Sequence, residues 1–152
     1  MTTDPSPHAA LERALTRLVR RAFLPTSGEH TRRQAGVDLE RAAYGTLVRI
    51  ADLGNPRLSD LAAALGLEVS TASRHVQRLV ADGYIEVATD PQDARARRYT
   101  PTPAGRDALE RVRAARRTHL VRLLEDWDPD EVSTLARGLD RIVDAFEGEE
   151  RG

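Results

Sequence analysis

The sequence predicts a mainly α-helical chain with one small two-stranded β-hairpin, on three observations. Apolar residues recur at helical spacing near both ends of the chain, as in the stripe of Leu11, Leu15 and Leu18. Two short helical patterns joined by a glycine-containing turn occupy residues 58–83. A short β-like stretch with turn residues at its centre follows over residues 84–102.

Length and composition limit the class of protein. A chain of 152 residues with 40% hydrophobic and 31% charged residues suits one globular domain. It has no cysteine, which excludes disulfides, cysteine–zinc sites, iron–sulfur clusters and thiol redox sensing. No apolar run reaches the roughly 18 residues of a membrane span, and the polar residues 1–8 do not resemble a secretory signal. We therefore expect a cytoplasmic protein with no cofactor and no membrane association.

The charge is distributed unevenly, although the net charge is only −1. All 23 basic residues are arginine. Between Ala94 and Arg117, eight arginines stand against two acids, a net charge of +6. Between Glu125 and Glu150, ten acids stand against two arginines, a net charge of −8. Such asymmetry indicates either a basic working surface beside an acidic one or ordinary solvated helix faces, and charge alone does not decide between them.

The first 37 residues predict a tail, a helix and a loop. Residues 1–8 form a flexible tail. Residues 9–37 hold a first amphipathic helix, which Pro25 and Gly28 bring to an end. Residues 29–36 contain no apolar residue larger than alanine, so we expect a loop there.

A second helix is expected to begin at Asp38, whose carboxylate suits an N-cap. Gly54 and Pro56 are the signals that end it. The apolar residues between these limits recur at helical spacing, so they should share one face. They are Leu39, Ala43, Leu47 and Ile50.

Residues 58–83 predict a helix-turn-helix. Ser59 is expected to cap the first helix and Gly66 to end it. Ser70 is expected to cap the second helix and Gly83 to end it. The buried stripe of the second helix is expected to consist of Val69, Ala72, Val76, Leu79 and Val80.

Two strands joined by a basic loop, an arrangement called a wing, are expected next. Tyr84, Ile85 and Val87 suit the first strand, residues 90–93 the turn, and residues 99–102 the return strand. The return strand contains Pro101, which lacks a ladder donor, so this strand should be short or lie at an edge.

Two helices are expected over residues 103–152. Pro103 suits the first turn of a long helix that runs to about Glu125, and Asp128 with Pro129 begins the last helix. The apolar side of the last helix is expected to carry Val132, Leu135, Leu139, Ile142 and Phe146.

The outward face of the second helix of the helix-turn-helix suits DNA. It carries hydroxyls and arginines, and no acid before Asp82. Arginine can read guanine, glutamine can read adenine, and serine or threonine can bind phosphate at the positive end of a helix. A solvated amphipathic helix is the alternative for this face taken alone. The preceding short helix and the basic wing favour DNA.

The wing adds arginines that can enter a narrow minor groove. Strand side chains alternate, so only one or two of Arg95, Arg97 and Arg98 should point outward. Asp93 is close enough in sequence to pair with Arg95 and brace the loop. The predicted DNA-contacting residues are Ser70, Thr71, Ser73, Arg74, His75, Gln77, Arg78, Arg95, Arg97 and Arg98.

The order of these motifs resembles the MarR family of bacterial winged-helix transcription regulators. The resemblance runs from about Leu11 to Phe146 and departs from the family pattern at Pro101, where an apolar residue is usual. The segments that carry it are LSDLAAALGL at 58–67, STASRHVQRLVADGYI at 70–85, DPQDAR at 90–95 and TPAG at 102–105.

This resemblance implies a winged helix-turn-helix over residues 38–102, with dimerisation helices in residues 9–37 and 103–152. It also implies a homodimer that binds a pseudo-palindromic double-stranded operator, and we expect a repressor. Family members commonly release DNA when a small aromatic or anionic effector binds, so the chain is expected to respond to a ligand. The candidate pocket residues are Phe23, His30, Tyr44, Leu47 and Arg113.

Two other classes of function compete with DNA binding. An enzyme is disfavoured because the sequence has no glycine-rich phosphate loop, no nucleophile elbow and no paired carboxylates on a histidine-bearing face. The four histidines show no metal-ligand spacing, so no metal site is expected. The alternative that stays open is a winged-helix module that binds proteins without specific DNA binding, which would not need a basic wing.

Overall fold

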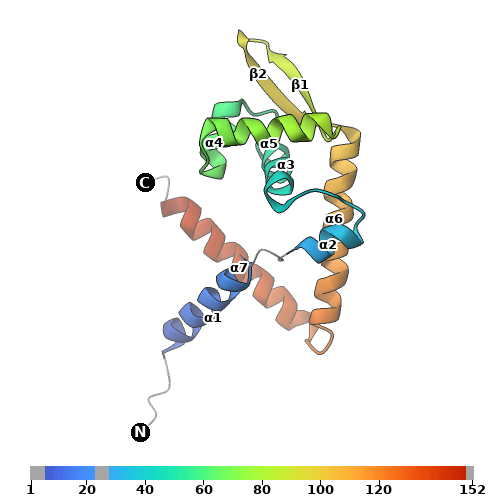
Figure 1. The fold of residues 1–152 in the computed structure, drawn as a ribbon. Coiled ribbons are helices and arrows are strands. Elements are labelled where there is room, and N and C mark those ends of the chain that lie inside the picture. The colour runs from blue at the N-terminus through green and yellow to red at the C-terminus, as the bar shows by residue number, and fades with distance from the viewer. Residues whose placement is uncertain (1–5, 23–27, 150–152) are drawn as a thin grey trace. The chain divides into compact units, whose positions relative to one another are not determined.

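The computed structural model describes residues 6–22 and 28–149. The chain divides after Ala115, inside its longest central helix, into two compact units. The elements, labelled in Figure 1, are α1 (Pro7–Ala22), α2 (Glu29–Gln34), α3 (Arg41–Leu53), α4 (Leu58–Leu65), α5 (Val69–Ala81), β1 (Ile85–Asp90), β2 (Asp93–Pro101), α6 (Pro103–Leu123) and α7 (Pro129–Glu149). This order confirms the predicted mainly α-helical fold with a two-stranded wing. No described helix combines the length and the apolar character that crossing a membrane requires.

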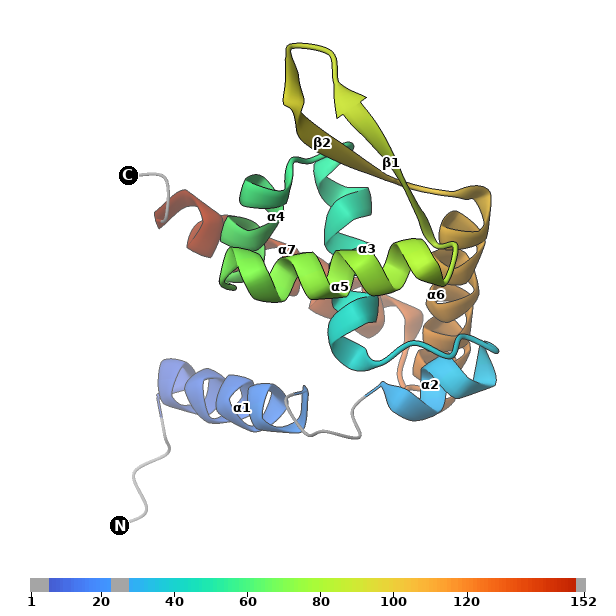
Figure 2. The same cartoon turned by 45° about the horizontal axis from the view of Figure 1, so that its top comes forward.

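The core of the first unit lies among α3, α4, α5, the base of the hairpin and the first half of α6. The helix α5 crosses α3, and the hairpin projects beyond the helices (Figure 2). The predicted apolar face of α3 is buried, as are Ala72, Val76 and Leu79 of α5. Two residues of the predicted buried stripe of α5 are exposed: the relative exposure is 51% for Val69 and 40% for Val80. The buried face of α5 is therefore narrower than the sequence pattern indicated.

The segment that we expected to be a loop, residues 29–36, forms the short helix α2. Its inward side chain is an arginine and not an aliphatic residue. Arg32 is buried, its Nε donates to the carbonyl oxygen of Leu39 at 3.0 Å, and its guanidinium lies 5.9 Å from the ring centroid of Tyr44. The apolar stem of an arginine can cover a hydrophobic surface while its head is hydrogen-bonded. A search for aliphatic periodicity could not detect such a helix.

The three predicted N-caps are each wrong by two residues, whereas the predicted ends of these helices are confirmed. The helices α3, α4 and α5 begin after Glu40, Arg57 and Glu68, and not at Asp38, Ser59 and Ser70. At α4 the capping acid lies inside the helix, where the Asp60 carboxylate accepts the Arg57 backbone N–H at 3.2 Å. The helix ends fall as predicted because Gly54, Gly66 and Gly83 all adopt positive φ, which glycine tolerates without strain.

The wing is a two-stranded antiparallel sheet in which Ile85 pairs with Pro101 and Val87 with Tyr99. The return strand β2 begins at Asp93, so it is longer than predicted and includes the arginines that we assigned to the loop. Pro101 is tolerated because each strand of a two-stranded sheet has one open edge. Pro101 led us to expect a return strand that is short or lies at an edge, and the structure shows the second of these.

The second unit contains the end of α6 and all of α7, which begin and end close to the predicted limits. No residue of α7 in the described part of the chain is buried. Apolar side chains of this unit stand in solvent, among them Val121 at 72% and Phe146 at 60% exposure. The second unit therefore presents apolar surface that a single chain leaves uncovered.

The start of α6 is held against the turn between α5 and β1. The Thr102 backbone N–H donates to the Tyr84 carbonyl oxygen at 3.0 Å, and the Thr102 hydroxyl donates to the Gly83 carbonyl oxygen at 2.7 Å. A Cβ on Gly105 would lie 2.1 Å from that Tyr84 oxygen. The close approach of helix and turn therefore requires glycine at position 105.

We expect Gly105→Ala to lower the free energy of unfolding by about 1–3 kcal/mol, the usual cost of overpacking, because a backbone carbonyl cannot swing aside as a side chain can. Urea unfolding of the two proteins measures the change. Gly45→Ala is the matched control, since a Cβ in that α3 position meets nothing within 4 Å. Alanine there should raise stability by up to about 1 kcal/mol through helix propensity. An equal effect of both substitutions would contradict the steric account.

Candidate nucleic-acid interface

The outward face of α5 carries exposed side chains that can donate hydrogen bonds. Arg74 and Gln77 are both exposed. The Arg74 Nη2 donates to the Thr71 hydroxyl at 3.2 Å, and the Gln77 amide donates to the Ser73 hydroxyl at 3.2 Å. These short bonds along the helix hold two long side chains over the surface of α5. They leave the other guanidinium hydrogens of Arg74 available for a ligand.

Two acids limit the positive charge of α5. Arg78 donates through Nε to the Asp82 carboxylate at 2.7 Å, and this hydrogen bond raises the pKa of Arg78 above its ordinary value. Glu68 directly precedes the first turn, beside Ser70 and Thr71. An acid there opposes the attraction that a helix N-terminus has for phosphate. Among the described residues, Arg74 is therefore the arginine of α5 whose charge no acid at ion-pair distance offsets.

His75 lies on the flank of α5 that packs toward α3. It is half-buried, and its Nδ1 lies 3.2 Å from the hydroxyl oxygen of Thr46. Thr46 is fully buried, and its hydroxyl donates to the Ala42 carbonyl oxygen at 2.9 Å. No local sequence pattern indicates this contact, because Thr46 lies within an apolar helix face and 29 residues from His75.

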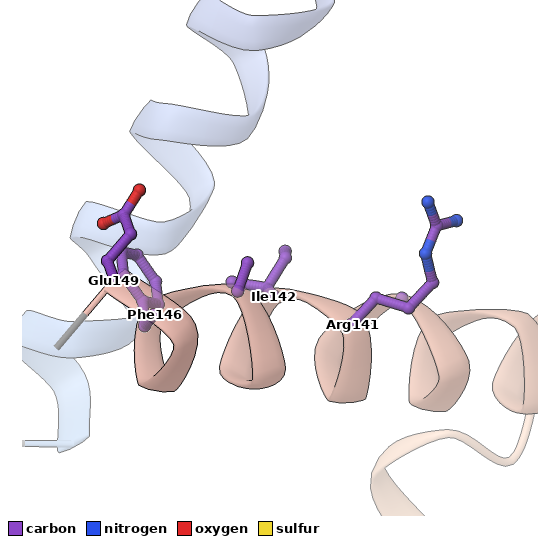
Figure 3. A pocket seen from close by; sticks show the side chains of 6 residues that line it. Arg141, Ile142, Phe146 and Glu149 are labelled. Atoms are coloured by element: carbon purple, nitrogen blue, oxygen red, sulfur yellow. The ribbon is translucent and has the colours of Figure 1, made fainter. Parts of the chain in front are cut away.

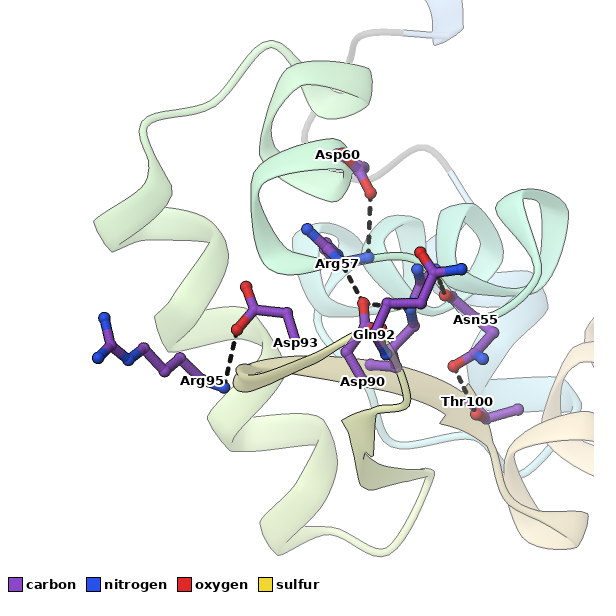
Figure 4. Close-up of polar contacts among 9 residues, drawn as sticks. Asn55, Arg57, Asp60, Asp90, Gln92, Asp93, Arg95 and Thr100 are labelled. Carbon is purple, nitrogen blue, oxygen red and sulfur yellow. Dashed lines mark hydrogen bonds and ion pairs between the residues drawn. The ribbon is translucent and has the colours of Figure 1, made fainter.

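A buried carboxylate joins the turn end of the wing to the start of α4. Asp90, at the end of β1, is 2% exposed and accepts hydrogen bonds from two arginines of different elements (Figure 4). The Arg57 Nε donates to it at 2.6 Å from the start of α4, and the Arg98 Nε donates at 2.9 Å from β2. Arg98 also donates through Nη1 to the Asn55 carbonyl oxygen at 3.0 Å. The wing is thus joined to the helix-turn-helix by one acid and two arginines.

The predicted brace between Asp93 and Arg95 takes a different form. The Asp93 carboxylate accepts the backbone N–H of Arg95 at 3.0 Å, which shapes the turn but does not neutralise the arginine. The Arg95 side chain extends away from this cluster (Figure 4). The residue that braces the wing is Asp90, which the sequence analysis treated only as turn chemistry.

The hydrogen bonds beside the wing turn hold the pKa of Asp90 down, from 3.8 to about 2. The largest cause is the Gln92 backbone N–H, which donates to the carboxylate at 2.8 Å, and the next is the Arg57 guanidinium. Burial acts in the opposite direction and is outweighed. The carboxylate therefore stays charged throughout the physiological pH range.

The three wing arginines divide into two kinds. Arg95 and Arg97 are exposed, and Arg97 donates through Nη1 to the Thr89 hydroxyl across the hairpin at 2.8 Å. Arg98 is half-buried in the Asp90 cluster. Two arginines pointing outward agrees with the number that strand alternation allows.

The predicted effector residues lie in different surroundings. Phe23 lies outside the described residues. Tyr44 and Leu47 belong to the buried core, while His30 and Arg113 are exposed. Their common role in a pocket stays a prediction. Among the described residues, no group of three or more histidines and acids could hold a metal ion.

Comparison with known proteins gives one consistent result. A sequence profile described as MarR family matches residues 37–96, which run from before α3 into β2. YxaD of Bacillus subtilis (strain 168), named an uncharacterized HTH-type transcriptional regulator, is 30% identical over 142 residues, which are 93% of this chain and 96% of YxaD.

Solved structures extend the likeness along the whole chain. RV1404 from Mycobacterium tuberculosis shares 28% identity with a TM-score of 0.74, over 95% of this chain and 97% of that one. The transcriptional regulator Tm0710 from Thermotoga maritima shares 26% identity with a TM-score of 0.70, over 94% and 98% of the two chains. The flanking helices are therefore included in the likeness, as well as the winged part.

We expect Asp90→Asn to destabilise the chain near neutral pH, because an amide nitrogen cannot accept the arginine hydrogen bonds. The folded pKa of Asp90 lies below the ordinary value, so its stabilising contribution is present above 3.8 and is lost as the pH falls toward about 2. The difference between the urea midpoints of wild type and Asp90→Asn should therefore become smaller as the pH falls through that range. Urea unfolding at several pH values measures this difference.

Asp93→Asn is the control for this experiment, since an asparagine oxygen still accepts the Arg95 backbone N–H. It should stay close to wild type at each pH. A gap between wild type and Asp90→Asn that is constant at all pH values would show that Asp90 does not lose its charge in this range.

Proposed function

The chain belongs to the MarR family of transcriptional regulators, and from this premise we propose that it is a homodimeric repressor of a pseudo-palindromic operator. It is a DNA-binding regulator and not an enzyme. One observation supports the proposed reading surface above the others. Within the part of the chain that the structure describes, Arg74, Arg95 and Arg97 have no acid at ion-pair distance, while Arg57, Arg78, Arg98 and Arg111 each have one.

We place α5 in the major groove and the wing in the adjacent minor groove. Arg74 reads a guanine edge, to which an arginine can donate two hydrogen bonds, and Gln77 contacts a neighbouring base. Ser70, Thr71 and Ser73 lie in the first turns of the helix, where backbone phosphates approach. Arg95 and Arg97 enter the minor groove. Arg78 and Arg98, which the sequence analysis grouped with these residues, hold the geometry through their acids.

The homodimer would cover the apolar surface of the second unit. The end of α6 and the start of α7 line an apolar groove, and Ile142 and Phe146 lie together on α7 between Arg141 and Glu149 (Figure 3). Leu11 and Leu18 of α1 are also exposed. Apolar surface of this extent on a single chain indicates a protein interface. A two-fold dimer would set two α5 helices about 34–36 Å apart, one turn of DNA.

Release by a small aromatic or anionic effector completes the proposal. Leu47 is fully buried, and Tyr44 lies beneath the buried Arg32. An effector that reached them would have to displace Arg32 from the Leu39 carbonyl oxygen and so loosen α2 from α3. Because an operator lies on the chromosome, the same proposal places the protein in the bacterial cytoplasm.

We expect Arg74→Ala and Arg97→Ala to weaken operator binding in different ways. Arg97→Ala should weaken binding to all sequences and lower the salt dependence by about one phosphate equivalent. Arg74→Ala should also relax base preference, because it removes a base contact. Anisotropy titrations with the DNA just upstream of the protein's own gene, over a range of salt and with unspecific competitor DNA, measure both effects.

Arg33→Ala is the control, because Arg33 pairs with Glu29 on α2, away from the proposed surface. It should bind the same DNA as wild type does. If Arg74→Ala and Arg97→Ala also bind as wild type, the residue assignment is wrong. If the folded wild-type dimer selects no fragment from genomic DNA, the protein-binding alternative is supported instead.

We expect Phe146→Asp to produce monomers and to abolish tight operator binding, because it buries a carboxylate in the proposed dimer interface. Sedimentation equilibrium measures the association and anisotropy measures the DNA binding. Ser133→Asp makes the same charge change on an exposed part of α7 about 140° around the helix from Phe146, and it should remain dimeric. Dimers of both variants with unchanged affinity would exclude this face from the interface.

A further inference from the structure

The contact between His75 and Thr46 determines which nitrogen of the histidine carries hydrogen. The Thr46 oxygen has two neighbours, the Ala42 carbonyl oxygen at 2.9 Å and the His75 Nδ1 at 3.2 Å. A hydroxyl has one hydrogen to donate, and a carbonyl oxygen can only accept. Thr46 therefore donates to Ala42 and accepts from His75. The neutral imidazole is held in the form that has its hydrogen on Nδ1.

The other ring nitrogen, Nε2, is then a hydrogen-bond acceptor. His75 is half-buried, and the described part of the chain has no buried side-chain nitrogen or oxygen without a partner. Nδ1 has its partner in Thr46, whereas no contact among the described residues engages Nε2. A buried Nε2 would therefore be a buried nitrogen without a partner, so Nε2 must reach solvent. On α5, His75 lies four residues after Thr71 and three before Arg78, so it neighbours both on the helix surface.

We propose that His75 accepts a hydrogen bond from the exocyclic amino group of an operator base, adenine N6 or cytosine N4, and that Thr46 is the positioning residue that fixes the accepting nitrogen. The inference rests on the proposed placement of α5 in the major groove. An accepting Nε2 cannot bind a phosphate oxygen, nor the guanine O6 and N7 atoms, since all of these are acceptors. His75 therefore contributes to base preference and not to backbone affinity.

The ring state can be measured in the free, full-length protein. Two-bond proton–nitrogen spectra of ¹⁵N-histidine-labelled protein, in buffer alkaline enough to keep imidazoles neutral, distinguish the two nitrogens. For His75 we expect a hydrogen on Nδ1 and none on Nε2. The His75 signals are identified by their disappearance from the spectrum of His75→Ala. A His75 that carries its hydrogen on Nε2 would overturn the proposal, whatever the protein binds.

Base preference is measured by selection from a randomised DNA duplex library, followed by titration of single-base variants of the selected site. At one position in each half-site, wild type should prefer adenine or cytosine, and the selected base says which of the two amino groups is read. The preference should be about 3- to 10-fold, the range for one neutral hydrogen bond. His75→Ala should lose this preference while its salt dependence stays that of wild type.

Substitution of Thr46 separates positioning from packing. Thr46→Ser keeps the hydroxyl and should keep the wild-type preference. Thr46→Val keeps the shape, removes the hydroxyl and frees the ring, so it should accept guanine at that position about as well as adenine or cytosine. Thermal unfolding confirms that both variants are folded.

The possible failures can be told apart. If Thr46→Val is folded and keeps the wild-type preference, this inference is wrong while the proposed function stands. If His75→Ala weakens binding to all sequences equally, the histidine is only a packing residue and the inference is again wrong. If wild type selects no duplex, the proposed function fails and the inference fails with it.

Discussion

The buried carboxylate of Asp90 is the contact on which the geometry of the DNA-facing surface depends. A charge so far from water is stable only when its hydrogen bonds are complete, and Asp90 completes them with a turn N–H and two arginines. Those donors come from the wing turn, the return strand and the start of α4. The hydrogen bonds of this one carboxylate therefore hold the wing in a fixed orientation to the helix-turn-helix. Arg95 and Arg97 follow the turn on β2, so this cluster also holds the strand that carries them.

The absence of lysine has structural consequences. Arg98 bonds Asp90 through Nε and the Asn55 carbonyl through Nη1, and Arg111 likewise bonds Asp107 through Nε and the Ala35 carbonyl through Nη1. A guanidinium can serve two acceptors in a fixed plane, whereas an ammonium group is a single point of charge. The arginines thus form hydrogen bonds and ion pairs that connect the elements, and they also form the basic surface. A count of basic residues therefore overstates the charge available to DNA.

How far the sequence predicts this structure depends on which side chains form the contacts. The helices with aliphatic stripes, the glycine ends and the hairpin were predictable, because burial and positive φ leave a pattern in the residue types. The helix α2 was missed because its inward residue is Arg32. The N-cap of α4 was misplaced because Asp60, inside its first turn, accepts the backbone N–H of Arg57 in place of a capping serine. Asp90 and Thr46 were missed because their partners are distant in sequence, which no local pattern reveals.

The helix α6 joins the two units, and its first half is rigidly attached to the winged unit. Thr102 and Gly105 hold its start against the turn after α5, and Arg111 reaches the carbonyls that end α2. The same helix continues beyond Ala115 into the unit with the exposed apolar surface. The chain passes between the units only through this helix. If two copies pair through that surface, the first half of α6 is a covalent path by which a change in how they pair can reach α5. The close contact that demands glycine at position 105 fixes the start of this path against the turn after α5, and it contributes to the stability of the winged unit.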